Sequence, residues 1–159
     1  MRVAGYRVVA DGPAGESPAE RRHRTLTELK RTIARHPAVD IATGVQSDAG
    51  RFRELDVVFD PLILGVDADH AGIRIDWRPR PDSTEPAYVV FHYYDSTGRD
   101  FGWHREPNPH VDGLEHYQER DSPESEYEYK PARFESRSPV EVLWDILGRI
   151  EERVAGGQE

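Results

Sequence analysis

The sequence predicts an α+β fold: an antiparallel sheet of about five or six strands, with a C-terminal amphipathic helix packed on one face and a short N-terminal helix. Short β-branched and aromatic runs follow one another between residues 55 and 104 with only short turns between them, which is typical of an antiparallel meander. A strongly periodic apolar segment closes the chain. The 159 residues suit a single domain, in which we expect residues 1–20 to be flexible, 119–128 to form an exposed acidic loop and 155–159 to fray.

The first 36 residues predict one short helix after a poorly structured start. Residues 6–10 favour a short strand, and residues 11–18, rich in glycine and proline, favour a turn. Leu26, Leu29 and Ile33 recur at helical spacing, so a helix is expected from about residue 27 to residue 36, capped by a threonine near its start. Residues 20–36 hold six basic and two acidic side chains, and this basic face either balances an acidic protein or contacts phosphate.

The middle of the chain predicts the strands of the sheet. Residues 55–59 are apolar and β-branched, and residues 62–66 are expected to continue that strand after Pro61. Residues 72–77 alternate between apolar and polar side chains, which indicates a half-buried strand. The strongest strand signal covers residues 87–94, the chain returns over 99–104, and a last short strand is expected within 127–134.

The C-terminal helix has the clearest start signal. Ser138 is expected to be the N-cap, Pro139 to occupy the first helical position, and Glu141 to complete a capping box. Apolar residues then recur at helical spacing, and they predict the face that packs on the sheet: Val140, Leu143, Trp144, Leu147, Ile150 and Val154.

The composition excludes several classes of protein. A net charge of −9 provides no general field for attracting a polyanion, although a local patch could still bind RNA. Only two of the 21 basic residues are lysines and no residue is cysteine, a composition typical of a salt-adapted, high-GC microbe such as a halophilic archaeon. No disulfide or thiolate metal site is possible. No signal peptide or membrane span is recognisable, so a cytoplasmic location without membrane contact is expected.

The segment from Trp103 to Gln118 is expected to be a functional loop. Three of the seven histidines lie here, His104, His110 and His116, and each is six residues from the next. Two prolines and a glycine keep its middle out of regular structure. Aromatic and cationic side chains stand beside the histidines: Trp103, Arg105 and Tyr117.

These residue types fit a metal-independent ribonuclease. Cleavage of RNA through the 2′-hydroxyl requires a base, an acid and a cation for the pentacoordinate phosphorus, and a histidine pair can supply the first two near neutral pH. Catalytic roles are therefore assigned to His104, His110 and His116, without a cofactor or a metal. The substrate-binding residues would be Arg105 on the phosphate, with Trp103 and Tyr117 stacking on bases.

Other interpretations of the same histidines stay open. His104, His110 and His116 could ligate a divalent metal, although ligands six residues apart form no specific motif. They could also be ordinary polar residues, as His23, His36 and His70 are expected to be, whereas His92 is expected to be half-buried and a possible partner of the loop. Dinucleotide-binding, P-loop and zinc-protease motifs are absent from the sequence. Four aspartates between residues 56 and 69 could form the metal site of a nuclease, but in a chain so rich in acidic residues such groupings also arise by chance.

The order of these segments resembles the TumE family of toxin components from prokaryotic toxin–antitoxin pairs. The residues that carry the resemblance are the tyrosine-rich strand at 91–95, the histidines between 104 and 116, the aromatic segment at 129–134 and the helix that Ser138 opens. The similarity covers about residues 54–154. It implies a cytoplasmic toxin that acts on RNA or translation and is neutralised by a helix-turn-helix antitoxin. The histidines of this chain are more widely spaced than those of the TumE family.

The sequence therefore favours a toxin component of a toxin–antitoxin pair that acts as an endoribonuclease. The alternative is a non-enzymatic protein-interaction module, which would use the acidic loop and the basic helix as its binding surfaces. Convergence of at least two of the three histidines with Arg105 in one cleft would favour the enzyme. Histidines splayed into solvent beside an exposed apolar patch would favour the module.

Overall fold

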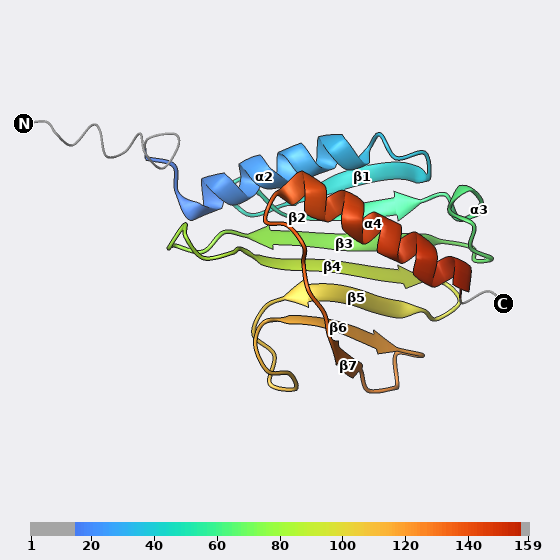
Figure 1. The fold of residues 1–159 in the computed structure, drawn as a ribbon. Coiled ribbons are helices and arrows are strands. Elements are labelled where there is room, and N and C mark those ends of the chain that lie inside the picture. Colours follow the sequence, from blue (N-terminus) through green and yellow to red (C-terminus); the bar gives the residue numbers. More distant parts are fainter. Residues whose placement is uncertain (1–14, 157–159) are drawn as a thin grey trace, which may run out of the picture.

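The computed structural model describes residues 15–156, which form one seven-stranded antiparallel sheet in the order β1-β2-β3-β4-β5-β6-β7. Each strand pairs with the next strand in the chain, so the sheet is a meander, as the sequence predicted (Figure 1). The strands are β1 (Val39–Gln46), β2 (Phe52–Phe59), β3 (Ala71–Arg78), β4 (Tyr88–Asp95), β5 (Asp100–Arg105), β6 (Glu115–Arg120) and β7 (Glu128–Pro131).

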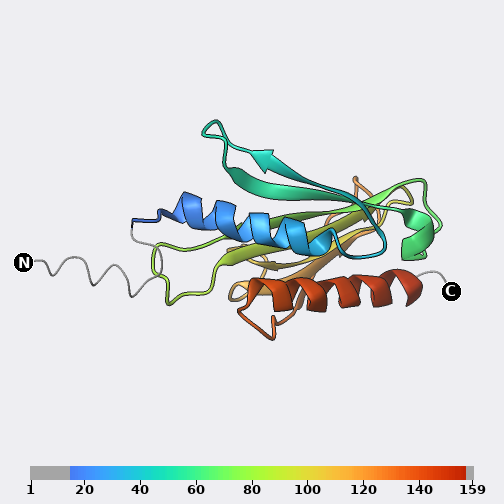
Figure 2. The ribbon, with the colours of Figure 1, turned by 90° about the horizontal axis from the view of Figure 1, so that it is seen from above.

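Two long helices, α2 (Pro18–Ile33) and α4 (Pro139–Gly156), lie on the same face of this sheet (Figures 1 and 2). Their apolar faces and the apolar face of β2–β5 form the core, which includes Leu29, Phe91 and Leu143. Within residues 15–156, neither long helix lies on the opposite face of the sheet, which is called the helix-free face below. The residues of a strand alternate between these two faces, so a residue's register decides whether it enters the core or the helix-free face.

The sheet has seven strands rather than five or six because β6, which lies within the expected histidine loop, and β1 were not predicted. The sequence of β1, VDIATGVQ, lacks a continuous apolar run, and it forms an edge strand whose residues are exposed or half-buried. The strand conformation of β1 is stabilised by its pairing with β2 and not by a strong preference of its own residues for a strand. The strand expected at residues 6–10 lies outside the described residues.

Helix α2 is longer than predicted and starts earlier. Ser17 is its N-cap: the Ser17 hydroxyl accepts a hydrogen bond from the Glu20 N–H, and the Glu20 carboxylate accepts one from the Ser17 N–H. This capping box, with Pro18 at the first helical position, begins the helix where a turn was expected. The helix ends at Ile33, and residues 34–36 follow in tighter turns.

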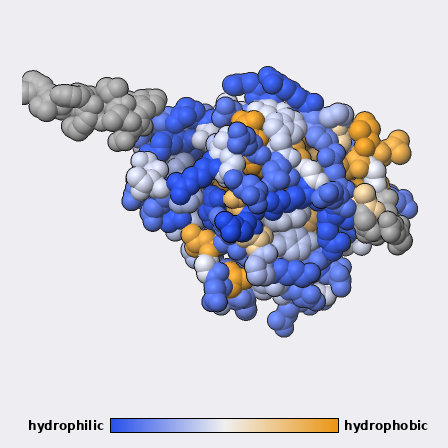
Figure 3. Space-filling view, in the orientation of Figure 1, coloured by the Kyte–Doolittle hydropathy of each residue, from blue (hydrophilic) through white to orange (hydrophobic). Residues whose placement is uncertain are grey.

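Residues 62–66 do not continue β2 but form a short helix, α3 (Pro61–Leu64). The Asp60 carboxylate accepts from the N–H groups of Leu62 and Ile63, and Gly65, at a φ of 90°, ends the turn. Leu62 and Ile63 consequently point outward and are exposed. Figure 3 shows hydrophobic colour gathered on the side of the molecule where α3 lies.

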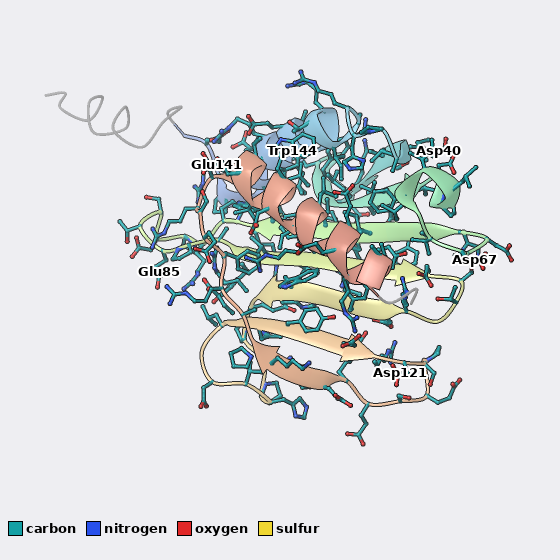
Figure 4. All side chains as sticks on the ribbon, turned by 45° about the vertical axis from the view of Figure 1, so that its right-hand side comes forward. Asp40, Asp67, Glu85, Asp121, Glu141 and Trp144 are labelled. Carbon is teal, nitrogen blue, oxygen red and sulfur yellow. The ribbon has the colours of Figure 1, made fainter. Side chains whose placement is uncertain are left out.

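Helix α4 begins at Pro139, as predicted, but its start is held differently. The Ser138 N–H donates to the Ser136 hydroxyl, which in turn donates to the Glu141 carboxylate at 2.7 Å. Of the apolar residues predicted for the buried face, Trp144 is instead exposed, and its ring stacks on His36 at 6.4 Å (Figure 4). Among the described residues, no helix is long and apolar enough to cross a bilayer.

Candidate functional site

The predicted histidine loop is largely two paired strands. Residues 103–105 belong to β5 and residues 115–118 to β6, so only residues 106–114 form the loop between them. The register places Trp103 opposite Tyr117 and His104 opposite His116. The two histidines point to the helix-free face, whereas Trp103 and Tyr117 point to the face that α4 covers. The candidate residues are therefore divided between two faces of the sheet.

A second histidine reaches His104 from β4. The Nδ1 atom of His92 lies 3.1 Å from the Nε2 atom of His104, and the two side chains are buried, with 9% and 4% of their surface exposed. The residue opposite His92 in β5 is Gly102. Because Gly102 has no side chain, the imidazole of His92 can lie across β5 and meet His104.

A carboxylate lies at each end of this histidine pair. The Nε2 atom of His92 donates a hydrogen bond to Asp100, and Glu106 accepts a hydrogen bond from the Nδ1 atom of His104 at 3.0 Å. Asp100 also accepts from Arg120 at 2.8 Å and from Tyr127 at 2.8 Å. The result is a continuous chain of carboxylate, imidazole, imidazole and carboxylate.

The number of protons in this chain decides its chemistry. Its three hydrogen bonds need one N–H each when both carboxylates are ionised, whereas two neutral imidazoles carry only two N–H groups. All three hydrogen bonds are therefore satisfied only when the pair His92–His104 binds one extra proton and becomes a shared imidazolium. In the neutral pair, the contact between the two rings has no proton. The pair can accept the extra proton as a base and release it as an acid.

Burial sets the direction in which this pair titrates. Desolvation lowers the pKa of His92 and of His104 below the ordinary value of 6.5, and it outweighs the raising effect of Asp100 and Glu106. Burial raises the pKa of Asp100, but hydrogen bonds from His92, Arg120 and Tyr127 bring it below its ordinary value. Burial therefore favours the neutral form of the pair, which is the form that a general base requires.

This titration predicts a loss of stability in mild acid. The histidine pair has a lower pKa in the folded protein than in the unfolded chain. Below about pH 6.5 the unfolded chain therefore binds more protons than the folded protein, and the free energy of unfolding decreases as the pH is lowered. We expect urea unfolding to give a lower stability at about pH 5.5 than at about pH 7.5. The variant His104→Gln should show a weaker dependence. Equal stability of the wild type at the two pH values would contradict this account.

The other two predicted histidines differ in their surroundings. His116 is fully buried, its Nδ1 atom donates to the Leu114 carbonyl at 3.1 Å, and its ring lies 5.3 Å from that of His104. His110 is in the loop, exposed, and its ring stacks on Tyr129 at 4.9 Å. Within residues 15–156, no group of three or more histidines or carboxylates is placed to hold a metal ion.

A cation that was not predicted stands beside the pair. Arg74 in β3 is directly opposite His92 in the register, and its charge contributes to lowering the pKa values of His92 and His104. Among the residues that the structure describes, no carboxylate lies within 4.0 Å of its guanidinium. Arg74 is therefore available to an anion on the helix-free face.

Arg105 occupies the other face and is held there by its neighbours. It is buried, its Nε atom donates to Glu115 at 3.0 Å, and its guanidinium lies over the Phe134 ring at 4.8 Å. The convergence expected for Arg105 with the histidines is thus absent, because consecutive strand residues point to opposite faces. Trp103 and Tyr117 do lie together, at 5.0 Å, beside a groove of about 680 Å³ next to α4.

The sequence alone does not reveal most of the surroundings of the pair His92–His104. It indicates His92 only as a possible partner of the loop, and it gives no role to Arg74, Asp100 or Glu106. The alternation of residues 72–77 carried part of the needed signal, since it places Arg74 on the polar face, whereas His92 stands in a run of apolar and aromatic residues. No protein-family model, curated protein or solved structure matches this chain.

Proposed function

We propose that this chain is an RNA-cleaving toxin component of a toxin–antitoxin pair, and that its acid–base centre is the pair His92–His104. The observation that carries the proposal is the hydrogen-bonded chain from Asp100 through the two imidazoles to Glu106, with the unpaired Arg74 beside it. The resemblance to the TumE family supports the toxin role, and the antitoxin would be a helix-turn-helix protein.

The proposed reaction is transesterification at an RNA phosphodiester. All four ring nitrogens of the pair are hydrogen-bonded, so the proton of the 2′-hydroxyl would reach the pair through the more exposed carboxylate of Glu106. The 2′-oxygen attacks phosphorus, and the bond from phosphorus to the 5′-oxygen breaks. The proton then held by the pair passes to that 5′-oxygen, so the products are a 2′,3′-cyclic phosphate and a 5′-hydroxyl. Arg74 would donate to the phosphate oxygens as negative charge develops on them. His116 would hold His104 in place, and His110 with Tyr129 would contact a base.

The test is cleavage of a mixed RNA substrate at high salt by the wild type and by Arg74→Ala, each with and without EDTA. Removal of a cation that stabilises the developing charge should reduce the cleavage rate by about 10²–10³-fold. EDTA should have no effect. Arg35→Ala is the matched control, because Arg35 is also an arginine but is exposed in the connection between α2 and β1.

Two results would contradict the proposal. Cleavage that stops in EDTA would assign the reaction to a metal ion. Equal rates for Arg74→Ala, Arg35→Ala and the wild type would remove Arg74 from the site. The toxin role has its own readout: expression of the wild type should arrest growth of a host cell, whereas expression of Arg74→Ala at the same level should not.

A further inference from the structure

A small pocket of about 210 Å³ lies at the end of the sheet where the connection between β3 and β4 runs. Both long helices begin at this end, and Glu85 marks it, whereas Asp67 and Asp121 lie at the far end (Figures 1 and 4). Four arginines line the pocket, one from each of four segments: Arg21, Arg80, Arg105 and Arg137. Its other walls are largely apolar, including Trp77 and several prolines.

Two of these arginines, Arg21 and Arg137, form no ion pair with a described carboxylate. Arg21 donates to the Arg80 carbonyl at 2.9 Å, and Arg137 donates to the Thr84 carbonyl at 3.1 Å. Both acceptors are neutral, and among the described residues neither guanidinium has a carboxylate within 4.0 Å. The hydrogen bonds orient the two side chains, and their remaining N–H groups are left for a ligand.

The other two arginines are fixed by neighbours. Arg80 donates to the Pro86 carbonyl at 2.8 Å, pairs with Glu85 at 3.1 Å and lies over the Tyr88 ring at 4.5 Å. Arg105 pairs with Glu115 at 3.0 Å. Both are held in place before any ligand arrives, which reduces the entropy lost on binding.

The charge at this pocket is opposite to that of the whole chain. Four guanidinium groups meet two carboxylates, Glu85 and Glu115, in a protein whose net charge is −9. A third carboxylate, Asp82, is nearby but accepts its hydrogen bonds from Thr84. Glu16 also interacts with the charge of Arg21, but it forms an ion pair with a further arginine, Arg24, at 2.8 Å. The local balance is therefore positive, and the pocket favours an anion.

We infer that this pocket binds a phosphate group, either free or at the terminus of a nucleotide. Several planar guanidinium groups that line one pocket match the three terminal oxygens of a phosphate better than the two oxygens of a carboxylate. The volume of about 210 Å³ is below the range of pockets that enclose a drug-sized molecule, but it accommodates a phosphate with bound water. The site does not depend on the histidine pair, because Arg105 lies on the opposite face of the sheet from His104.

Calorimetry at low salt with inorganic phosphate, adenosine monophosphate and adenosine tests the inference without any cleavage assay. The wild type should bind the first two and not adenosine. Tighter binding of the monophosphate than of phosphate would identify a nucleotide terminus as the ligand, and equal binding would identify the phosphate group alone. The double variant Arg21→Ala/Arg137→Ala should bind at least about tenfold more weakly.

Two further variants distinguish a loss of phosphate binding from a loss of folding. Glu85→Gln removes the exposed carboxylate that pairs with Arg80 and should strengthen phosphate binding severalfold. Arg133→Ala removes an exposed arginine outside the pocket and should leave the affinity unchanged. Absence of phosphate binding by the wild type, or equal weakening by Arg133→Ala and the double variant, would overturn the inference. The melting temperature of each variant shows whether it is folded.

Discussion

Replacement of His104 by glutamine should lower the rate of RNA cleavage by about 10²–10⁴-fold, because the proposed proton transfer passes through this imidazole. The glutamine amide can still donate a hydrogen bond toward the Nδ1 atom of His92, but it cannot take up or release a proton near neutral pH. Glu106 keeps its ion pair with Arg78 at 3.1 Å. The substitution thus removes the acid–base function and leaves the neighbouring charges paired.

The matched control is His70→Gln, since His70 is an exposed histidine outside the sheet face that holds the pair. Rates should be measured across pH, because loss of the pair should also remove the pH dependence that its lowered pKa gives to the wild type. Retention of the full rate by His104→Gln, with unchanged products, would exclude the pair as the acid–base centre. A parallel loss in His70→Gln would indicate a general effect on the protein.

The elements that were predicted correctly are those with strong local signals. Residues 72–77 and 87–94 alternate or carry β-branched and aromatic residues, and Pro139 marks the start of α4. The elements that were predicted wrongly or not at all are stabilised by contacts that the local sequence does not reveal. Strand β1 has little local signal and is ordered by its pairing with β2, and α3 depends on the cap that Asp60 provides to Pro61–Leu64.

The site was predicted only in part for a geometric reason. Spacing along the chain brought attention to His104 and His116, and the register does place these two side by side. Spacing could not show that Arg105 points away from them, because this depends on which strand residues face the core. The hydrogen bond between His92 and His104 joins residues 12 apart in sequence, and it depends on the gap above Gly102.

Replacement of Gly102 by alanine should therefore damage both the fold and the site. A Cβ atom at this position would lie 2.5 Å from the Phe91 carbonyl oxygen and 2.6 Å from the Nδ1 atom of His92. The Phe91 oxygen belongs to the backbone of the neighbouring strand, so it can move away only if β4 and β5 separate. We expect the free energy of unfolding to fall by about 1–3 kcal/mol, measured by urea unfolding.

Gly148→Ala is the matched control, because an added Cβ there meets no atom within 4 Å and the residue lies within α4. Alanine has the better helix propensity, so this variant should gain about 0.5–1 kcal/mol. The same chemical change would thus have opposite signs at the two sites. If Gly102→Ala were as stable as the wild type and kept the loss of stability in mild acid, His92 would not need the gap above Gly102. The arrangement proposed for the histidine pair would then be wrong.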